Sequence, residues 1–176
     1  LQYRFDGPEN RSGYRMVSGI STKDGFRLRF EYASGGRLAG IISSRGKFLK
    51  VETDESGRVL CVSVNQDGEE VKLVRYRYDD RGDMVETLDA LDVSKHFVYS
   101  GGHLLVQLTN QGDMSFHWEY EGKGENARCV HTWGDGGVME YFIRYGKGYT
   151  HIRNGENAET EYYYGCLLYT SPSPRD

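Results

Sequence analysis

The chain has 176 residues, with 23 glycines, 14 tyrosines and only 3 prolines, and its formal net charge is −4. The surplus of acidic side chains argues against a nucleic-acid partner, which requires a basic patch, and no apolar run approaches the roughly 18 residues that a membrane-spanning helix needs. Abundant glycine and tyrosine favour many short strands joined by tight turns, and because apolar residues nowhere follow helical spacing over three turns, we expect almost no helix.

The first clear pattern lies at residues 26–32, where Phe, Leu, Phe and Tyr alternate with Arg, Arg and Glu. A period of two predicts a strand with one buried and one solvated face. The stretch closes on Tyr32 and runs into a glycine-rich turn. The same sequence of strand, tyrosine and turn recurs with closing residues Tyr78, Tyr99, Tyr120, Tyr145 and Tyr164, and a degenerate copy has Thr53 in the tyrosine position. An interval of roughly 20–25 residues indicates an array of similar supersecondary units.

A second turn is predicted about midway through each repeat. The candidate sites are Asp24-Gly25, Arg45-Gly46, Asp67-Gly68, Gln111-Gly112, Asp135-Gly136-Gly137 and Asn154-Gly155. Asp-Gly and Asn-Gly predict type I′ hairpins, in which both central residues have positive φ. The corresponding segment 89–92 has no glycine, so we expect an aspartate there to adopt the left-handed conformation.

These patterns predict an all-β fold, an array of antiparallel β-hairpins with about eight residues per strand that forms part of a curved sheet or shell. One face carries Phe, Tyr, Leu and Val, and the other carries Arg, Glu, Lys and His. A single hairpin cannot bury its apolar face, so neighbouring hairpins must cover it. We interpret the aromatic rows as a packed face because they share a phase with Leu and Val; a platform for sugars or single-stranded nucleic acid is the alternative.

The repeats occupy residues 1–165, and residues 166–176 differ in kind. This last stretch breaks the alternation, contains two prolines and resembles a translated sequencing adapter, so we expect a non-native tail. A natural proline-rich linker is the alternative. No signal peptide is visible, and because the chain starts at Leu1 we expect its native N-terminus to be missing.

No residues stand out as catalytic. Cys61, Cys129 and Cys166 are too few and too far apart for a disulfide framework or a zinc site, and the five histidines lack the i, i+4 spacing of a helical zinc site. No motif brings a nucleophile, base and acid together. We therefore expect no enzymatic activity, no metal and no cofactor.

The repeats resemble the YD repeats of the Rhs family. That pattern is a strand ending in Tyr-Asp, then two residues, then Gly-Arg-Leu; residues 78–84 carry the Tyr-Asp and the Gly, residues 32–38 the Tyr and Gly-Arg-Leu, and residues 54–59 the part from Asp onward. Residues 128–137 resemble a stretch of bacterial Rhs proteins. The repeat positions that this resemblance selects are Tyr32, Gly36, Tyr78, Gly82, Tyr99, Tyr120, Trp133, Gly136, Tyr145 and Tyr164.

The resemblance implies a structural module, part of a β-shell that encapsulates a C-terminal polymorphic toxin domain of the same polypeptide. It also implies delivery by a secretion-system spike or a toxin complex, and a secreted or cell-surface location afterwards. The family's self-cleavage region, with its Asp-Pro pairs, does not occur in this sequence. A repeat surface that binds carbohydrate or the cell envelope is the alternative function.

Overall fold

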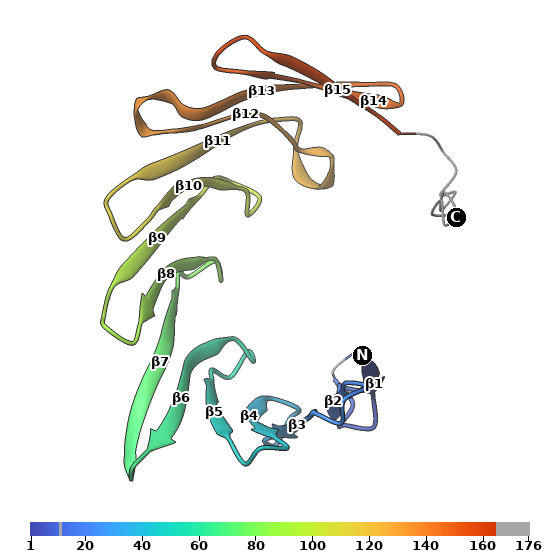
Figure 1. Cartoon of the computed structure of the whole chain (residues 1–176), viewed down its shortest axis with the longest axis vertical. Coiled ribbons are helices and arrows are strands. Elements are labelled where there is room, and N and C mark those ends of the chain that lie inside the picture. Colours follow the sequence, from blue (N-terminus) through green and yellow to red (C-terminus); the bar gives the residue numbers. More distant parts are fainter. Residues whose placement is uncertain (11, 165–176) are drawn as a thin grey trace. The chain divides into compact units, whose positions relative to one another are not determined.

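The computed structural model describes residues 1–10 and 12–164, so the expected tail at residues 166–176 lies outside the described part. Those residues form an antiparallel sheet of 15 strands, in which every strand lies beside its neighbours in sequence (Figure 1). The predicted all-β array of hairpins is therefore confirmed. The chain divides into two compact units, residues 1–96 and the remainder from Phe97.

The first unit is an antiparallel meander, built from hairpins that follow one another directly along the chain. Its strands are β1 (Gln2–Arg4), β2 (Gly19–Ser21), β3 (Arg27–Tyr32), β4 (Leu38–Ser43), β5 (Phe48–Thr53), β6 (Val59–Gln66), β7 (Glu69–Tyr78), β8 (Met84–Asp89) and the first part of β9 (Ser94–Tyr99).

The second unit continues the same architecture. Its strands are the end of β9, β10 (Leu105–Thr109), β11 (Ser115–Glu121), β12 (Arg128–Gly134), β13 (Val138–Gly146), β14 (Tyr149–Asn154) and β15 (Glu159–Tyr163). Two three-residue 3₁₀ turns, η1 (Gly124–Asn126) and η2 (Asp135–Gly137), are the helical elements of the described residues. Most strands have five to seven residues, fewer than the eight that we expected.

The two faces of the sheet differ in chemistry as the alternation predicts. In the first unit, cross-strand pairing places Phe30, Ile41, Leu49 and Val64 in one row across four strands. The next row, on the opposite face, is Glu31, Gly40, Lys50 and Ser63. Because successive side chains point to opposite faces, these two rows lie on opposite faces of the sheet.

The second unit contains an exception to this phase. Trp133 pairs with His117, and Phe142 lies between His131 and Arg153 in the pairing of β12, β13 and β14. Both aromatic side chains therefore lie on the charged face. The expectation that the aromatic residues share one phase with Leu and Val is wrong at these two positions and at Phe48, Tyr149 and Tyr163.

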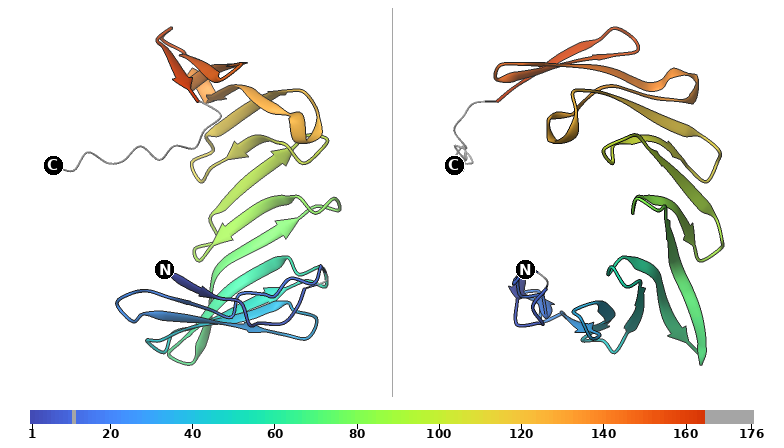
Figure 2. Two further views of the ribbon diagram at one scale, coloured as in Figure 1. Left: turned by 90° about the vertical axis from the view of Figure 1, so that its right-hand side faces the viewer. Right: turned by 180° about the vertical axis from the view of Figure 1, so that it is seen from behind.

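Burial is shallow because each unit is a single layer of strands (Figure 2). Among the described residues, Val51 and Cys61 are the only buried apolar side chains, with 6% and 5% of their surface exposed. Large apolar residues such as Val138 and Tyr162 are 46% and 57% exposed. Neighbouring hairpins therefore cover one another only in part, and the apolar face remains accessible.

The hairpin turns correct one expectation. The predicted type I′ geometry occurs at Asp67 and Gly68, whose φ values are 54° and 92°. At Asp24-Gly25, Arg45-Gly46, Gln111-Gly112 and Asn154-Gly155 the chain instead forms a longer turn with one left-handed residue. In this turn the N–H of residue i donates to the carbonyl of i+4, and the N–H of i+3 donates to the carbonyl of i. This is a type I turn followed by a left-handed residue, the usual three-residue hairpin connection.

The same pair of backbone hydrogen bonds occurs after Tyr32, Thr53 and Tyr78. The connections after Tyr120 and Tyr145 differ, because η1 follows β11 and a two-residue loop joins β13 to β14. Residue i+3 is left-handed Gly36 after Tyr32 and Gly82 after Tyr78, with φ of 75° and 88°. The glycine-free turn at residues 89–92 uses Asp92 with φ of 62°, which confirms the expectation that an aspartate supplies the left-handed position.

Candidate functional site

The recurring polar feature of the array is a hydrogen bond that joins a closing tyrosine to the neighbouring strand. The Tyr78 hydroxyl, at the end of β7, donates to the backbone carbonyl of Val59, which opens β6, at 2.9 Å. Equivalent bonds join Tyr32 to Val17 (2.6 Å), Tyr120 to Leu105 (2.9 Å), Tyr145 to Cys129 (2.8 Å) and Tyr164 to Tyr149 (3.3 Å). We call each such bond a tyrosine clasp.

Each clasp closes the open end of a hairpin, because β2–β3, β6–β7, β10–β11, β12–β13 and β14–β15 are antiparallel pairs. The tyrosine lies at or next to the end of one strand, and the carbonyl lies at or just before the start of the neighbouring strand. The tyrosine therefore fixes the end of the hairpin that the turn does not. Thr53 ends β5 in the same position, as the repeat spacing predicts, but its side chain has no ring with which to form a clasp.

Burial accounts for the state of the clasping hydroxyls. Removal from solvent raises the pKa of Tyr32, Tyr78, Tyr120 and Tyr145 above the ordinary value for tyrosine. The hydroxyl therefore keeps its proton and can donate it to a carbonyl across the physiological range.

Several turns of the array are held by acidic or amide side chains at position i. The Oδ1 atom of Asp54 accepts the backbone N–H groups of Ser56 and Arg58, each at 2.9 Å. Asp79, Asp89, Asn110 and Asn154 make the same pair of bonds to residues i+2 and i+4. These Asx contacts satisfy backbone donors that no strand reaches.

Two of these carboxyl groups are shifted toward the ionised form. Burial by itself raises the pKa of Asp54, but the hydrogen bonds from Arg58 outweigh it, and the net pKa is below the usual value. The pKa of Asp79 is lowered in the same way, because hydrogen bonds from the Asp83 backbone and the Arg81 side chain outweigh burial.

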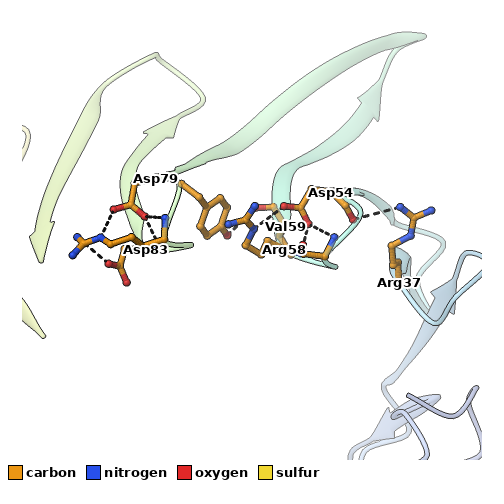
Figure 3. A network of polar contacts seen from close by, with 9 residues as sticks. Arg37, Asp54, Arg58, Val59, Asp79 and Asp83 are labelled. Carbon is orange, nitrogen blue, oxygen red and sulfur yellow. Dashed lines mark hydrogen bonds and ion pairs between the residues drawn. The ribbon is translucent and has the colours of Figure 1, made fainter. Parts of the chain in front are cut away.

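Arginines connect one clasp to the next turn (Figure 3). The Arg58 guanidinium lies over the Tyr78 ring, 5.0 Å from its centroid, while its Nε donates to Asp54 Oδ2 at 2.6 Å. Arg37 donates to the Asp54 carbonyl at 3.4 Å, so a chain of contacts runs from one turn to the next. In the second unit Arg128 lies over the Tyr145 ring at 5.1 Å, and this arginine also precedes the clasped carbonyl.

The repeat positions selected from the sequence fall on these features and do not converge on one pocket. Tyr32, Tyr78, Tyr120, Tyr145 and Tyr164 form clasps, and Gly36 and Gly82 are left-handed turn residues. Tyr99 is half-buried at the end of β9. Gly136 has φ of 72° within η2. Trp133 lies on the charged face of the preceding strand, β12.

The sequence reasoning missed the acceptors and the arginines. A signal for the turns was present, since Asp or Asn recurs three residues before the left-handed position. The clasps gave a weaker signal. Tyr32, Tyr120 and Tyr164 each lie 15 residues after the residue whose carbonyl they bind, but the spacing at the other clasps differs because it depends on strand length.

One carboxylate within η2 differs from the others in its partners. Asp135 accepts the backbone N–H of Ser115 at 2.7 Å and lies 3.1 Å from His117 Nε2. The bond from Ser115, followed by the bond from His117, holds the pKa of Asp135 below its usual value. This contact fastens the start of β11 to the end of β12.

Residues 1–10 and 12–164 contain no group of three or more His, Cys, Asp or Glu side chains arranged to hold a metal ion. Within the same residues, no helix has the length and apolar character needed to cross a bilayer.

Comparison with known proteins gives similarity of fold without similarity of sequence. No family model matches the chain, and no curated protein sequence matches it. Among solved structures, TcdB2-TccC3-TEV and TcdB2-TccC3 without its hypervariable C-terminal region each match with a TM-score of 0.57 and 14% identity over 74% of this chain. The Tc holotoxin pore of Photorhabdus luminescens with the TccC3 mutation D651A matches with a TM-score of 0.56 and 14% identity over the same share of this chain.

This chain spans 7% of the length of each of these matched chains. At 14% identity the likeness concerns the fold alone. A fold similar to this array of antiparallel hairpins therefore also occurs within chains of Tc toxin assemblies.

Proposed function

We propose that this chain is a structural, non-enzymatic repeat module, a segment of a β-shell that encloses a C-terminal toxin domain of the same polypeptide. The observation that carries the proposal is the open apolar face of a single-layer sheet whose hairpins are individually closed by clasps and Asx turns. A wall needs strand-to-strand cohesion without a second layer, and its inner face is covered by what it contains.

Two further features support the proposal. The matched Tc toxin chains have the same fold, and the hydroxyls of five closing tyrosines already donate to backbone carbonyls. Tyrosines whose hydroxyl groups are bonded to the backbone in this way help to hold neighbouring strands together. Association with a toxin complex or a secretion-system spike, and a secreted or cell-surface location, belong to the same proposal.

Protease protection of the complete gene product tests the proposal of containment. We expect the segment that follows residue 164 to resist a non-specific protease while the sheet is folded, and to be digested once urea unfolds the sheet. The double variant Tyr78→Phe/Tyr120→Phe, which lacks two clasps, should expose that segment at a lower urea concentration than the natural chain. Rapid digestion of the segment beside an intact, folded sheet would contradict containment.

A binding surface is the second candidate, and one feature of the first unit favours it. Eight basic and two acidic residues lie between Arg15 and Lys50, in a chain whose net charge is −4. Arg4, Arg27 and Arg29 line a hollow of about 950 Å³ over β1–β4. The test is retention of the chain on a sulfated dextran column. Retention that is lost in the double variant Arg27→Gln/Arg29→Gln but kept in Arg144→Gln would favour a surface that binds an anionic envelope polymer.

A further inference from the structure

A continuous stack of rings crosses four strands on the charged face of the second unit. The Trp133 ring lies 5.1 Å from His117 and 4.3 Å from His131, centroid to centroid. His131 also stacks on Phe142 at 4.3 Å, and the Arg153 guanidinium lies 4.3 Å from the Phe142 centroid. These residues come from β11, β12, β13 and β14, and we call them the ring stack.

His131, at the centre of the ring stack, has a carboxylate at each ring nitrogen. Its Nδ1 is 3.4 Å from Glu119 Oε2 on β11, and its Nε2 is 2.9 Å from Glu140 Oε1 on β13. A neutral imidazole carries one N–H, so it can donate to only one of these carboxylates and presents a lone pair to the other. The imidazolium donates to both, and each bond is then charge-assisted.

The two aromatic neighbours favour the same protonation state. Trp133 and Phe142 lie on opposite sides of His131 along the stack, with interplanar angles of 23° and 9°. A cation is attracted to the face of an aromatic ring, most strongly to tryptophan. The His131 side chain is 19% exposed, so solvent screens these interactions less than it would at an open surface.

Other charged side chains lie on the strands that surround His131. The nearest cation in the stack, Arg153, is separated from His131 by Phe142 and donates to Asn157 Oδ1 at 2.6 Å. His117 faces Asp135 at 3.1 Å, and His151 faces Glu159 at 3.5 Å. The charged or titratable residues on this face include His117 and Glu119 on β11, Asp135 in η2, Glu140 and Arg144 on β13, His151 and Arg153 on β14, and Glu159 and Glu161 on β15.

We propose that His131 is a proton-sensitive brace, whose protonated ring ties β11 to β13 across β12 and stabilises the second unit in mildly acidic solution. Loss of the proton leaves one carboxylate facing a lone pair and ends the cation–aromatic attraction. The sheet of the second unit is then less stable, although its strand pairing is unchanged. This inference concerns the second unit alone and holds whether or not the chain lines a shell.

The direct test is the protonation of His131 in the intact chain, read from histidine labelled with ¹³C and ¹⁵N. His96 is the internal reference, because it is exposed and has a single carboxylate, Glu86, at 4.0 Å. We expect the imidazolium signals of His131, with both nitrogens protonated, to persist to a higher pH than those of His96, because His131 has a carboxylate at each ring nitrogen. Deprotonation of His131 at the same pH as His96, or at a lower one, would overturn the proposal.

The consequence for stability is tested with His131→Gln, since glutamine can donate one hydrogen bond but cannot take up a proton. The unfolding midpoint of the natural chain should rise by about 2–4 °C between pH 8 and pH 6, the shift that a change of roughly 1 kcal/mol gives in a protein of this size. His131→Gln should lose this rise and His96→Gln should keep it. An unchanged rise in His131→Gln would refute the brace, and the labelling measurement decides the question if that variant fails to fold.

Discussion

Removing the hydroxyl of Tyr78 without removing its ring isolates the clasp. In Tyr78→Phe the ring remains under the Arg58 guanidinium, 5.0 Å from its centroid, while the 2.9 Å bond to the Val59 carbonyl is lost. A hydrogen bond between uncharged groups contributes about 0.5–1.5 kcal/mol to stability. We therefore expect Tyr78→Phe to lower the free energy of unfolding by about 1 kcal/mol.

Removing the ring as well should cost more. Tyr78→Ala loses the hydrogen bond, the cation–π contact of about 0.5–1 kcal/mol and the packing of a half-buried aromatic ring. Full truncation of a core Phe costs about 3–5 kcal/mol, and partial exposure reduces the packing contribution, so we expect about 3 kcal/mol in total. Tyr99→Ala, at the equivalent position of β9, should cost a similar amount, about 3 kcal/mol or more.

Urea unfolding followed by tyrosine and tryptophan fluorescence measures these differences, with the slope of the transition used to check that the unfolded state is unchanged. Tyr162→Phe is the matched control, because Tyr162 is 57% exposed and makes no side-chain hydrogen bond within the described structure. Its stability should stay within about 0.5 kcal/mol of the natural chain. Equal effects of Tyr78→Phe and Tyr162→Phe would show that the clasps contribute nothing to the cohesion of the hairpins.

Four further outcomes are expected. The pKa of Asp135 is lowered in the folded state, so its contribution to folding stability is present above the unfolded pKa of about 4 and is lost as pH falls through the lower folded pKa. In Asp135→Asn the thermal midpoint should therefore depend less on pH below about 4 than it does in the natural chain. Gly82→Ala should cost about 1–2 kcal/mol in urea unfolding because φ there is 88°, whereas Gly101→Ala, where φ is not positive and no atom lies near the added Cβ, should cost less than about 1 kcal/mol. Deleting residues 166–176 should change stability by less than about 0.5 kcal/mol, and a loss of 2 kcal/mol would identify them as a natural packed segment. Residues 1–165 alone should form oligomers in light scattering, because open sheet edges invite pairing; a cooperative, soluble monomer would favour a self-contained binding domain.

Hydrophobic alternation was enough to predict the strands. Residues 26–32 have a strict period of two, and β3 runs from Arg27 to Tyr32. Where the alternation was weaker, repeat spacing supplied the missing strand, as with β5, which ends at Thr53. These predictions rest on local interactions, because each strand pairs with the strands that precede and follow it in the chain.

The turn type was harder to predict because glycine marks a turn without saying which residue is left-handed. At Gln111-Gly112 the left-handed residue is Asp113, and at Asn154-Gly155 it is Asn157. The side chain at position i, Asn110 or Asn154, sets the register of the turn by accepting two backbone N–H groups. The dipeptide rule therefore assigned the left-handed conformation to the wrong residue in these two turns.

The ring stack shows where residue alternation fails to predict which face of the sheet a side chain occupies. Trp133 and Phe142 belong to the charged face, where the alternation of Leu and Val gave no reason to expect them. Their neighbours there are His131 and Arg153, which come from pairing across strands. Cross-strand register decides such contacts, and a one-residue change in a turn would move every partner. A single sequence does not supply that register.

The topology itself bears on what this chain can do. An active site usually joins side chains from elements that are distant in sequence but adjacent in space. Within each unit of this array, a strand lies beside its sequence neighbours, so a side chain meets residues of the adjoining hairpins and of few others. Such an arrangement repeats the same local contacts, as the clasps and Asx turns do, and presents two extended faces. It therefore supports the proposal of a wall whose chemistry is cohesion along the sheet, with the proton-sensitive ring stack as a local modification of that cohesion.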